Sequence, residues 1–201
     1  MASSSYIEAD LENIYNMLDR LYNSVGIILG RVLSSLSEWR EVHIDDSATM
    51  VELMASSIED EATLFIARYQ PLGPELIDSK AAIKVSYDLF RIARYAREIA
   101  HLISSVRIDK IDEAIAESAQ AIEEMFKLGY KAFRDLNPEL LPRVEELEKV
   151  CDEAYHKSLK ILAESESVDK RDAITALTAR HLERIADHIV YIAKLSRRRS
   201  K

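Results

Sequence analysis

Apolar residues recur at intervals of three and four along nearly the whole chain, with polar residues between them. This spacing places the apolar side chains on one face of an α-helix, whereas a half-buried strand would need strict alternation. The pattern predicts helices over residues 5–38, 46–69, 75–104, 109–135, 139–164 and 170–198. We therefore expect an all-α protein with six long helices.

The short segments between these helices contain residues that cap or interrupt a helix. Two prolines flank Gly73 in "YQPLGPE", and Pro138 follows Asn137 in "DLNPE". Short connections favour antiparallel neighbours, so the six helices should form an elongated bundle. The candidate N-cap residues are Asp45, Asp46, Ser47, Asp109, Asn137, Ser167 and Asp169.

The chain repeats itself at an offset of 93 residues. "LFRIARYAREIAHL" (89–102) then lies over "LERIADHIVYIAKL" (182–195), and seven of the fourteen positions are identical. At a slightly different offset, "ILGRVL" around Gly30 resembles "KLGYKAF" around Gly129. Internal self-similarity of this kind indicates repeated structural units. We expect two tandem three-helix bundles, residues 1–105 and 106–201, related by a pseudo-two-fold axis.

Composition and charge narrow the class of protein. The chain has 201 residues, 48% hydrophobic, with a single cysteine, Cys151, which excludes an intramolecular disulfide. The N-terminal "MASSSYIEAD" has no apolar run long enough for a signal peptide or a membrane span, so we expect a cytoplasmic protein. The net charge is −8, and five of the positive charges lie in the tail "KLSRRRSK", which we expect to fray. Without a broad basic face, direct nucleic-acid binding is not expected.

Two pairs of carboxylates stand out in the second unit. Glu148 and Asp152 are four residues apart, as are Glu183 and Asp187, so each pair shares a helix face. Like charges stacked in this way are destabilising unless something positive lies between them. Four carboxylates suit Mg²⁺, Ca²⁺ or Mn²⁺, and carboxylate-rich helical sites also hold iron or zinc. A solvated helix face would show the same spacing.

A second set of possible metal ligands indicates a different class of protein. Glu98–His101 and Glu153–His156 are Glu-x-x-His motifs, as in ferritin-like di-iron bundles, which would make the chain a metal oxidase. No nucleophile–base motif, glycine-rich phosphate loop or zinc-finger spacing is present in the sequence, so we do not expect an enzyme unless the carboxylates act through a metal. A scaffold with a vestigial metal site is the remaining alternative.

"RHLERIADHIVYIAK" (180–194) resembles the signature of the PhoU family of phosphate-uptake regulators, approximately L-E-R-I-G/A-D-H/x-A-x-N-I-A-E. "RYQP" followed by "KVSYDLFRIARYA" is similar to the first repeat of the same family. The resemblance implies two three-helix bundles. It also implies multinuclear iron or zinc bound through paired E(D)-x-x-x-D motifs, which here makes Glu148, Asp152, Glu183 and Asp187 the metal ligands.

The resemblance further implies contacts with a phosphate ABC transporter and a sensor histidine kinase, and a homodimer is the commonest oligomer to expect. Some members of the family carry a fused DNA-binding domain. Because this chain begins directly with its first helix, we expect any effect on transcription to pass through another protein.

The first unit departs from the family pattern. At the shifted positions it has Ala55 and Glu59 in place of one carboxylate pair, and Phe90 and Arg94 in place of the other. We therefore expect no metal in the first unit. We predict instead that the Arg94 guanidinium pairs with the Glu59 carboxylate, with Phe90 filling the volume left by the missing acid.

Overall fold

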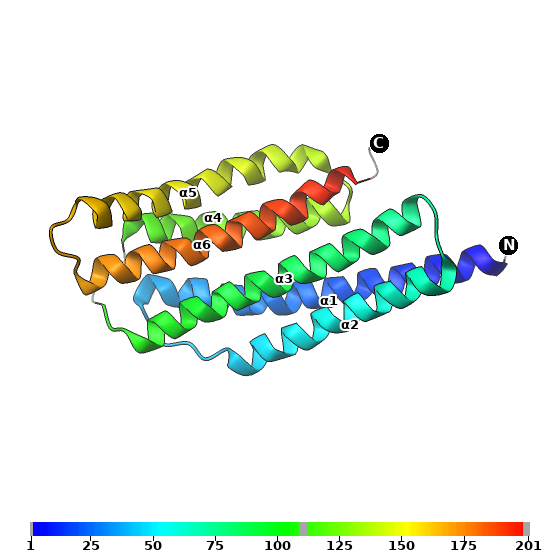
Figure 1. Ribbon diagram of the computed structural model, residues 1–201, viewed down its shortest axis with the longest axis horizontal. Coiled ribbons are helices and arrows are strands. Elements are labelled where there is room, and N and C mark those ends of the chain that lie inside the picture. The colour runs from blue at the N-terminus through cyan, green and yellow to red at the C-terminus, as the bar shows by residue number, and fades with distance from the viewer. Residues whose placement is uncertain (1, 109–111, 199–201) are drawn as a thin grey trace.

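The computed structural model describes residues 2–108 and 112–198, and within those ranges the chain forms six long helices and no strand (Figure 1). The expected all-α helical bundle is confirmed, with helix ends within four residues of the predicted ones. The elements are α1 (Ala2–Glu38), α2 (Asp45–Tyr69), α3 (Pro74–Ser105), α4 (Glu113–Arg134), the 3₁₀ turn η1 (Pro138–Leu140), α5 (Leu141–Glu164), α6 (Lys170–Lys194) and the 3₁₀ turn η2 (Leu195–Arg197).

Side-chain caps fix some of the helix starts. The Asp169 carboxylate accepts a hydrogen bond from the backbone N–H of Asp172 at 2.8 Å, as expected for an N-cap of α6. Helix α4 begins later than predicted because Asp112 caps it, and the predicted cap Asp109 lies outside the described residues. Helix α2 differs too: Ile44 is its N-cap residue, and Asp45 lies in the first turn, where its charge favours the helix dipole.

The helices form two groups of three that lie against each other along their length (Figure 1). Helices α1 to α3 pack on one another, as do α4 to α6, and α3 runs beside α6 between the outer helices α2 and α5. Helices α1 and α4 approach each other less closely. The two termini of the described chain lie at the same end of the bundle.

Two contacts between α3 and α6 show how the repeats are related. The His188 imidazole lies 2.8 Å from the Asp88 carboxylate, and the His181 ring lies 6.0 Å from the Tyr95 ring. In the repeat alignment His181 corresponds to Asp88 and His188 corresponds to Tyr95. If each residue is replaced by its equivalent in the other repeat, the contact between His188 and Asp88 becomes the contact between Tyr95 and His181. Helices α3 and α6 are therefore antiparallel and related by a pseudo-two-fold axis.

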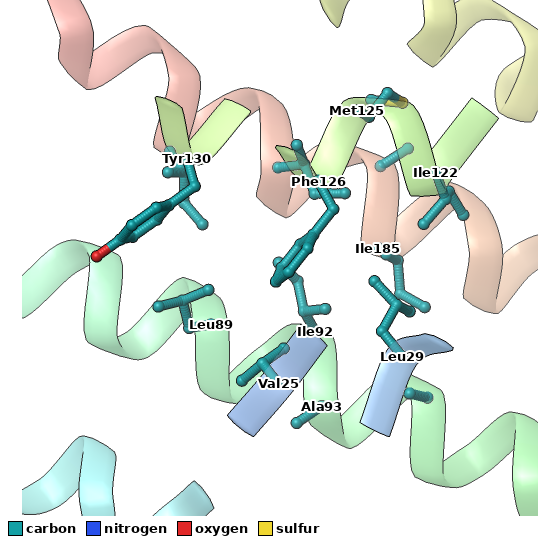
Figure 2. Close-up of a cluster of buried hydrophobic side chains, with 14 of the residues drawn as sticks. Val25, Leu29, Leu89, Ile92, Ala93, Ile122, Met125, Phe126, Tyr130 and Ile185 are labelled. Carbon is teal, nitrogen blue, oxygen red and sulfur yellow. The ribbon is translucent and has the colours of Figure 1, made fainter. Parts of the chain in front are cut away.

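One hydrophobic core extends across both repeats. Leu89 and Ile92 from α3, Ile185 from α6 and Met125 from α4 are fully buried in the same cluster. Figure 2 shows that side chains from α1, α3, α4 and α6 converge there. Because each repeat covers apolar surface of the other, neither group of three helices buries its own core alone. The other labelled members are Val25, Leu29, Ala93, Ile122, Phe126 and Tyr130.

The expectation that the basic tail frays is wrong at Arg198, and residues 199–201 of that tail lie outside the described residues. The Arg198 Nε lies 2.8 Å from the Asp78 carboxylate on α3, and only 5% of the Arg198 side chain is exposed. The same guanidinium donates to the Tyr15 hydroxyl on α1 and to the Phe133 carbonyl on α4. An arginine held by groups from three helices is ordered because its charge is paired inside the bundle.

Candidate metal centre

The four predicted ligands sit on adjacent helices at the margin of the core. Glu148 and Asp152 lie on α5 on either side of the buried Cys151, and Glu183 and Asp187 lie on α6 around the buried Ile185. Beside the apolar stripe, Glu148, Asp152 and Asp187 are half-buried. Glu183 is buried, with 7% of the residue exposed.

The electrostatics show that the two pairs of carboxylates influence each other across α5 and α6. Burial raises the pKa of the Glu148 carboxyl, and the charges of Asp152 and Asp187 raise it further. Burial also raises the pKa of the Asp187 carboxyl, followed by the effect of the Glu183 charge. A raised pKa on a carboxyl means that its charged form is disfavoured where it stands. The quartet therefore gathers negative charge that a cation would stabilise.

Two arginines of α6 hold the pair of carboxylates on that helix. The Arg184 Nε and Nη2 atoms bind the two oxygens of Glu183 at 2.8 and 2.7 Å. Its Nη1 lies 3.0 Å from an oxygen of Asp187, and Arg180 Nη1 reaches Glu183 at 2.8 Å. Bidentate guanidinium–carboxylate pairs are among the stronger hydrogen-bonded contacts in proteins. A guanidinium thus stands in as the cation between the acids of α6.

In the chemistry of their oxygen atoms, the four carboxylates suit a divalent cation. Four carboxylates project from neighbouring faces of two helices, and oxygen donors of this kind bind hard or borderline cations. Their present arrangement is spread out, since within the described ranges no three His, Cys, Asp or Glu side chains gather closely enough to hold a metal ion. In this conformation Glu183 and Asp187 are bound by Arg184.

Sequence reasoning missed Arg180 and Arg184, although the signal was present. Arg180 precedes Glu183 by three residues, and Arg184 precedes Asp187 by three, a spacing at which helical side chains meet. The two arginines therefore alternate with the two acids along the same face of α6. The charge pattern of a helix face includes both signs.

The corresponding positions of the first repeat lack this charge cluster. Ala55 is buried and Phe90 is half-buried. The predicted ion pair between Arg94 and Glu59 is wrong: both side chains are exposed, and in the described part of the chain no ion pair joins them. An exposed pair gains at most about 1 kcal/mol, which does not order two long side chains.

Arg91 shows what the loss of the carboxylates leaves behind. It is the repeat equivalent of Arg184, but the residue before it is Phe90 where α6 has Glu183. Its guanidinium lies 5.0 Å from the centre of the Tyr95 ring and donates to the Tyr95 hydroxyl. Its Nε is buried and has no hydrogen-bond partner among the residues described. The first repeat thus has the arginine without the acidic neighbour that Arg184 binds.

The alternative ligand set is not brought together. The His101 ring lies 3.3 Å from Asp45, and the His156 Nδ1 lies 2.7 Å from the backbone carbonyl of Asp152. Each of these contacts stays within one repeat, and both histidines are exposed. A ferritin-like di-iron site needs such groups to converge inside one bundle, so the oxidase alternative is not supported.

Two residues beside the predicted ligands, His188 and Cys151, make contacts of a structural kind. His188 turns toward Asp88 on α3, so it is not directed at the carboxylates of its own repeat. Cys151 is fully buried, and burial raises the pKa of its thiol to about 12. A thiol with so high a pKa is protonated at neutral pH and is a poor nucleophile and metal ligand.

The fold and the acidic centre define a class: helical bundles built from two three-helix repeats. A family model described as "PhoU domain" matches residues 115–196. A phosphate-specific transport system accessory protein PhoU homolog of Archaeoglobus fulgidus is 30% identical over 145 residues, which is 71% of this chain and 67% of that protein. The chain belongs to the PhoU family.

Further relatives extend the match to almost the full length. PhoU homolog 1 of Thermotoga maritima is 27% identical over 94% of this chain and 86% of that protein. The crystal structure of PhoU from Pseudomonas aeruginosa has the same fold, with a TM-score of 0.78 at 21% identity over 94% of this chain and 96% of that one. The phosphate transport system regulatory protein PhoU from Streptococcus pneumoniae matches with a TM-score of 0.79 at 15% identity, covering 97% of both chains.

In the described part of the chain, no helix is both long and apolar enough to cross a membrane.

Proposed function

We propose that this chain regulates phosphate uptake through protein–protein contacts and binds a metal ion in its second repeat. The observation that carries the proposal is the match, over most of the chain, to accessory proteins of phosphate-specific transport systems. In this role the chain is a cytoplasmic regulator and not an enzyme. Its partners are a phosphate ABC transporter, a sensor histidine kinase or both, and it acts as a homodimer.

The metal site of the proposal consists of Glu148, Asp152, Glu183 and Asp187. Iron or zinc is the expected ion, with Mg²⁺, Ca²⁺ and Mn²⁺ as further candidates. The raised pKa of the Glu148 and Asp187 carboxyls supports this assignment, because a bound cation relieves the same repulsion that raises them. When bound, the ion supplies charge neutralisation and a cross-link between α5 and α6.

The regulatory function is tested by deleting the gene in its source organism and measuring uptake of radiolabelled phosphate in phosphate-rich medium. Uptake should rise in the deletion strain and return to the wild-type level when the gene is restored. Unchanged uptake after deletion, with other family members absent from the strain, would contradict the proposed function.

The metal site is tested by the thermal stability of chelator-stripped protein with and without Zn²⁺ alone. Binding stabilises only the folded state, so Zn²⁺ should raise the melting temperature of the wild type. Asp152→Asn should abolish this rise. Glu59→Gln is the matched control, because Glu59 is the exposed repeat equivalent of Asp152 and should leave the rise unchanged. An equal rise in both variants would place the zinc elsewhere.

A further inference from the structure

Helix α2 is an outer helix of the bundle (Figure 1), and its outward side is apolar. Met50, Leu53 and Leu64 are 57%, 59% and 55% exposed. Together with the exposed Ser57 they follow one another at intervals of three, four and seven residues, which places all four on one side of the helix. The buried residues of α2, such as Val51, pack on the other side against α1 and α3. Helix α2 is therefore apolar on two opposite sides.

The second repeat shows that this apolar surface is not a requirement of the fold. Helix α5 is the equivalent outer helix, and its residues at the three apolar positions are charged and exposed: Arg143, Glu146 and Lys157. The Arg143 Nη1 lies 2.9 Å from the Glu146 carboxylate, an arrangement that suits a helix face in water. The inner side is preserved, since Val51 corresponds to Val144 and both are buried. The apolar residues on the outside of α2 are thus not needed to fold a repeat.

Negative charge borders the apolar surface of α2. The helix has six acidic residues and one basic residue, Arg68, whose guanidinium already lies 3.0 Å from the Asp10 carboxylate on α1. Asp46 and Asp60 are seven residues before and after Leu53, so they lie on the same side of the helix, and both are exposed. Within the described ranges neither of these two acids forms an ion pair. The surface therefore combines exposed apolar side chains with negative charge that no cation neutralises.

This combination favours one kind of occupant. The α2 helix of a second copy would bring two helices of like charge together, and an anionic lipid surface would be repelled for the same reason. A helix with one apolar side bordered by lysine and arginine offers both a matching apolar stripe and the opposite charge. From Met50 to Leu64 the apolar stripe of α2 is about 21 Å long at the usual helical rise, which accommodates about four turns of such a helix.

We propose that the outward surface of α2, formed by Met50, Leu53, Ser57 and Leu64, docks a basic amphipathic helix of a partner protein. The apolar side of the partner helix packs on these residues, and its basic residues lie opposite the acids that border them. This inference rests on the proposed regulation through protein–protein contacts, because it names the chemistry of one such contact.

The probe is a fluorescent helical peptide of about five turns, with leucine at heptad positions a and d and lysine elsewhere, and its binding is measured by fluorescence anisotropy. Met50→Arg with Leu53→Glu gives α2 the residues of α5 and leaves the net charge unchanged, and it should weaken peptide binding by roughly tenfold or more. The matched control is Tyr6→Glu with Ile27→Arg on α1, where the residues are 67% and 66% exposed. This control should bind as the wild type does. Circular dichroism verifies that each variant is folded.

A second pair of variants tests the charge. Asp60→Asn with Glu61→Gln keeps the apolar side chains, and it should weaken binding and make it depend less steeply on NaCl concentration. Glu117→Gln with Glu123→Gln is the control, because it removes two exposed acids from α4 and should leave the affinity unchanged. A peptide with glutamate in place of lysine should not bind the wild type.

Three results would overturn the proposal: no binding of the lysine peptide by the wild type, equal binding by Met50→Arg with Leu53→Glu, or equal binding of the glutamate peptide. Sedimentation supplies a fourth, since a wild-type dimer that this double variant turns into a monomer would mean that a second copy covers α2. If the double variant does not fold, Leu64→Lys decides the matter, because it installs the residue of α5 at one position only.

Phosphate uptake in the deletion strain separates this inference from the proposed function. The gene carrying Met50→Arg with Leu53→Glu should fail to restore the wild-type level of uptake, whereas the gene carrying Tyr6→Glu with Ile27→Arg should restore it. Full restoration by the first gene would overturn docking on α2 and leave the regulatory function standing. A deletion without effect on uptake would overturn the regulatory function, and peptide binding would still decide what α2 docks.

Discussion

The two repeats carry the same arginine in opposite surroundings. Arg184 is surrounded by carboxylates that it binds, whereas Arg91 lies against tyrosine rings and keeps a buried Nε without a partner in the described chain. The residues that build the shared core are retained in both, with Leu89 matching Leu182 and Ile92 matching Ile185. Packing constrains the buried positions of both repeats, whereas the charged positions at the margin of the core differ between them.

The difference between the repeats with the largest expected effect on stability is the buried ion pair between Arg198 and Asp78. Their side chains are 5% and 1% exposed. In repeat two the position equivalent to Asp78 is Arg171, which is exposed. Arg198→Ala removes a buried guanidinium that binds groups from α1, α3 and α4, so it should destabilise the protein by about 3–5 kcal/mol and lower the melting temperature by roughly 10 °C.

Thermal denaturation checks this prediction, with Arg171→Ala as the control that should change little. The double variant Arg198→Ala with Asp78→Ala should recover part of the loss, because it removes the buried carboxylate as well. A melting temperature for Arg198→Ala within 2 °C of the wild type would show that the pair does not tie the repeats together.

The glycines that correspond in the two repeats have different neighbours. A Cβ added to Gly129 would lie 2.6 Å from the Ile189 Cγ2 atom and 3.2 Å from the Ile189 carbonyl oxygen, so α4 would have to move from α6. A Cβ added to Gly30 meets no atom within 4 Å. Gly129→Ala should destabilise by about 1–3 kcal/mol through overpacking, whereas Gly30→Ala should stabilise by about 0.5–1 kcal/mol through helix propensity. Chemical denaturation of both variants measures the two effects, and equal signs would refute the contrast.

The histidines at the pseudo-two-fold axis form the next comparison. His188 hydrogen bonds the nearly buried Asp88 at 2.8 Å, while the buried Nδ1 of His181 has no partner in the residues described. His188→Leu leaves Asp88 without that bond and should destabilise the protein by about 1–3 kcal/mol. His181→Leu removes an unsatisfied polar atom and should be close to neutral. Unfolding in urea at pH 7 distinguishes them, and a larger loss for His181→Leu would reverse the interpretation.

The smallest expected effect concerns pH. The Glu148 pKa is raised above its usual 4.5 by burial and by the charges of Asp152 and Asp187, so folding disfavours the charged form of this carboxyl. The contribution of Glu148 to the free energy of unfolding is fully present below pH 4.5. It is lost as the pH rises through the pKa that this carboxyl has in the folded state. Glu148→Gln should therefore raise the melting temperature of metal-free protein at pH 7 by about 1–3 °C and change little at pH 4. The exposed Glu52→Gln is the control, and a stabilisation that does not depend on pH would contradict the assignment.

Much of the candidate site was accessible to sequence reasoning, because helical spacing alone places Glu183 and Asp187 on one face. The 93-residue repeat also located the positions in the first unit where the acids are missing. The exposed Arg94 and Glu59 were wrongly paired because opposite charge at nearby positions does not ensure contact when both side chains are in water. Arg184 was missed because its choice between solvent and Glu183 depends on how deeply Glu183 is buried.

The amino-acid sequence by itself determined the helices, their approximate ends and their duplication, since these depend on residue spacing, caps and breakers that act locally. Only the tertiary structure decided that the two repeats share one core, that Arg198 pairs with Asp78 across 120 residues, and that His188 meets Asp88 and not its own repeat's acids. Those contacts join segments distant in the chain, and their partners are chosen by packing and desolvation, which no local pattern encodes.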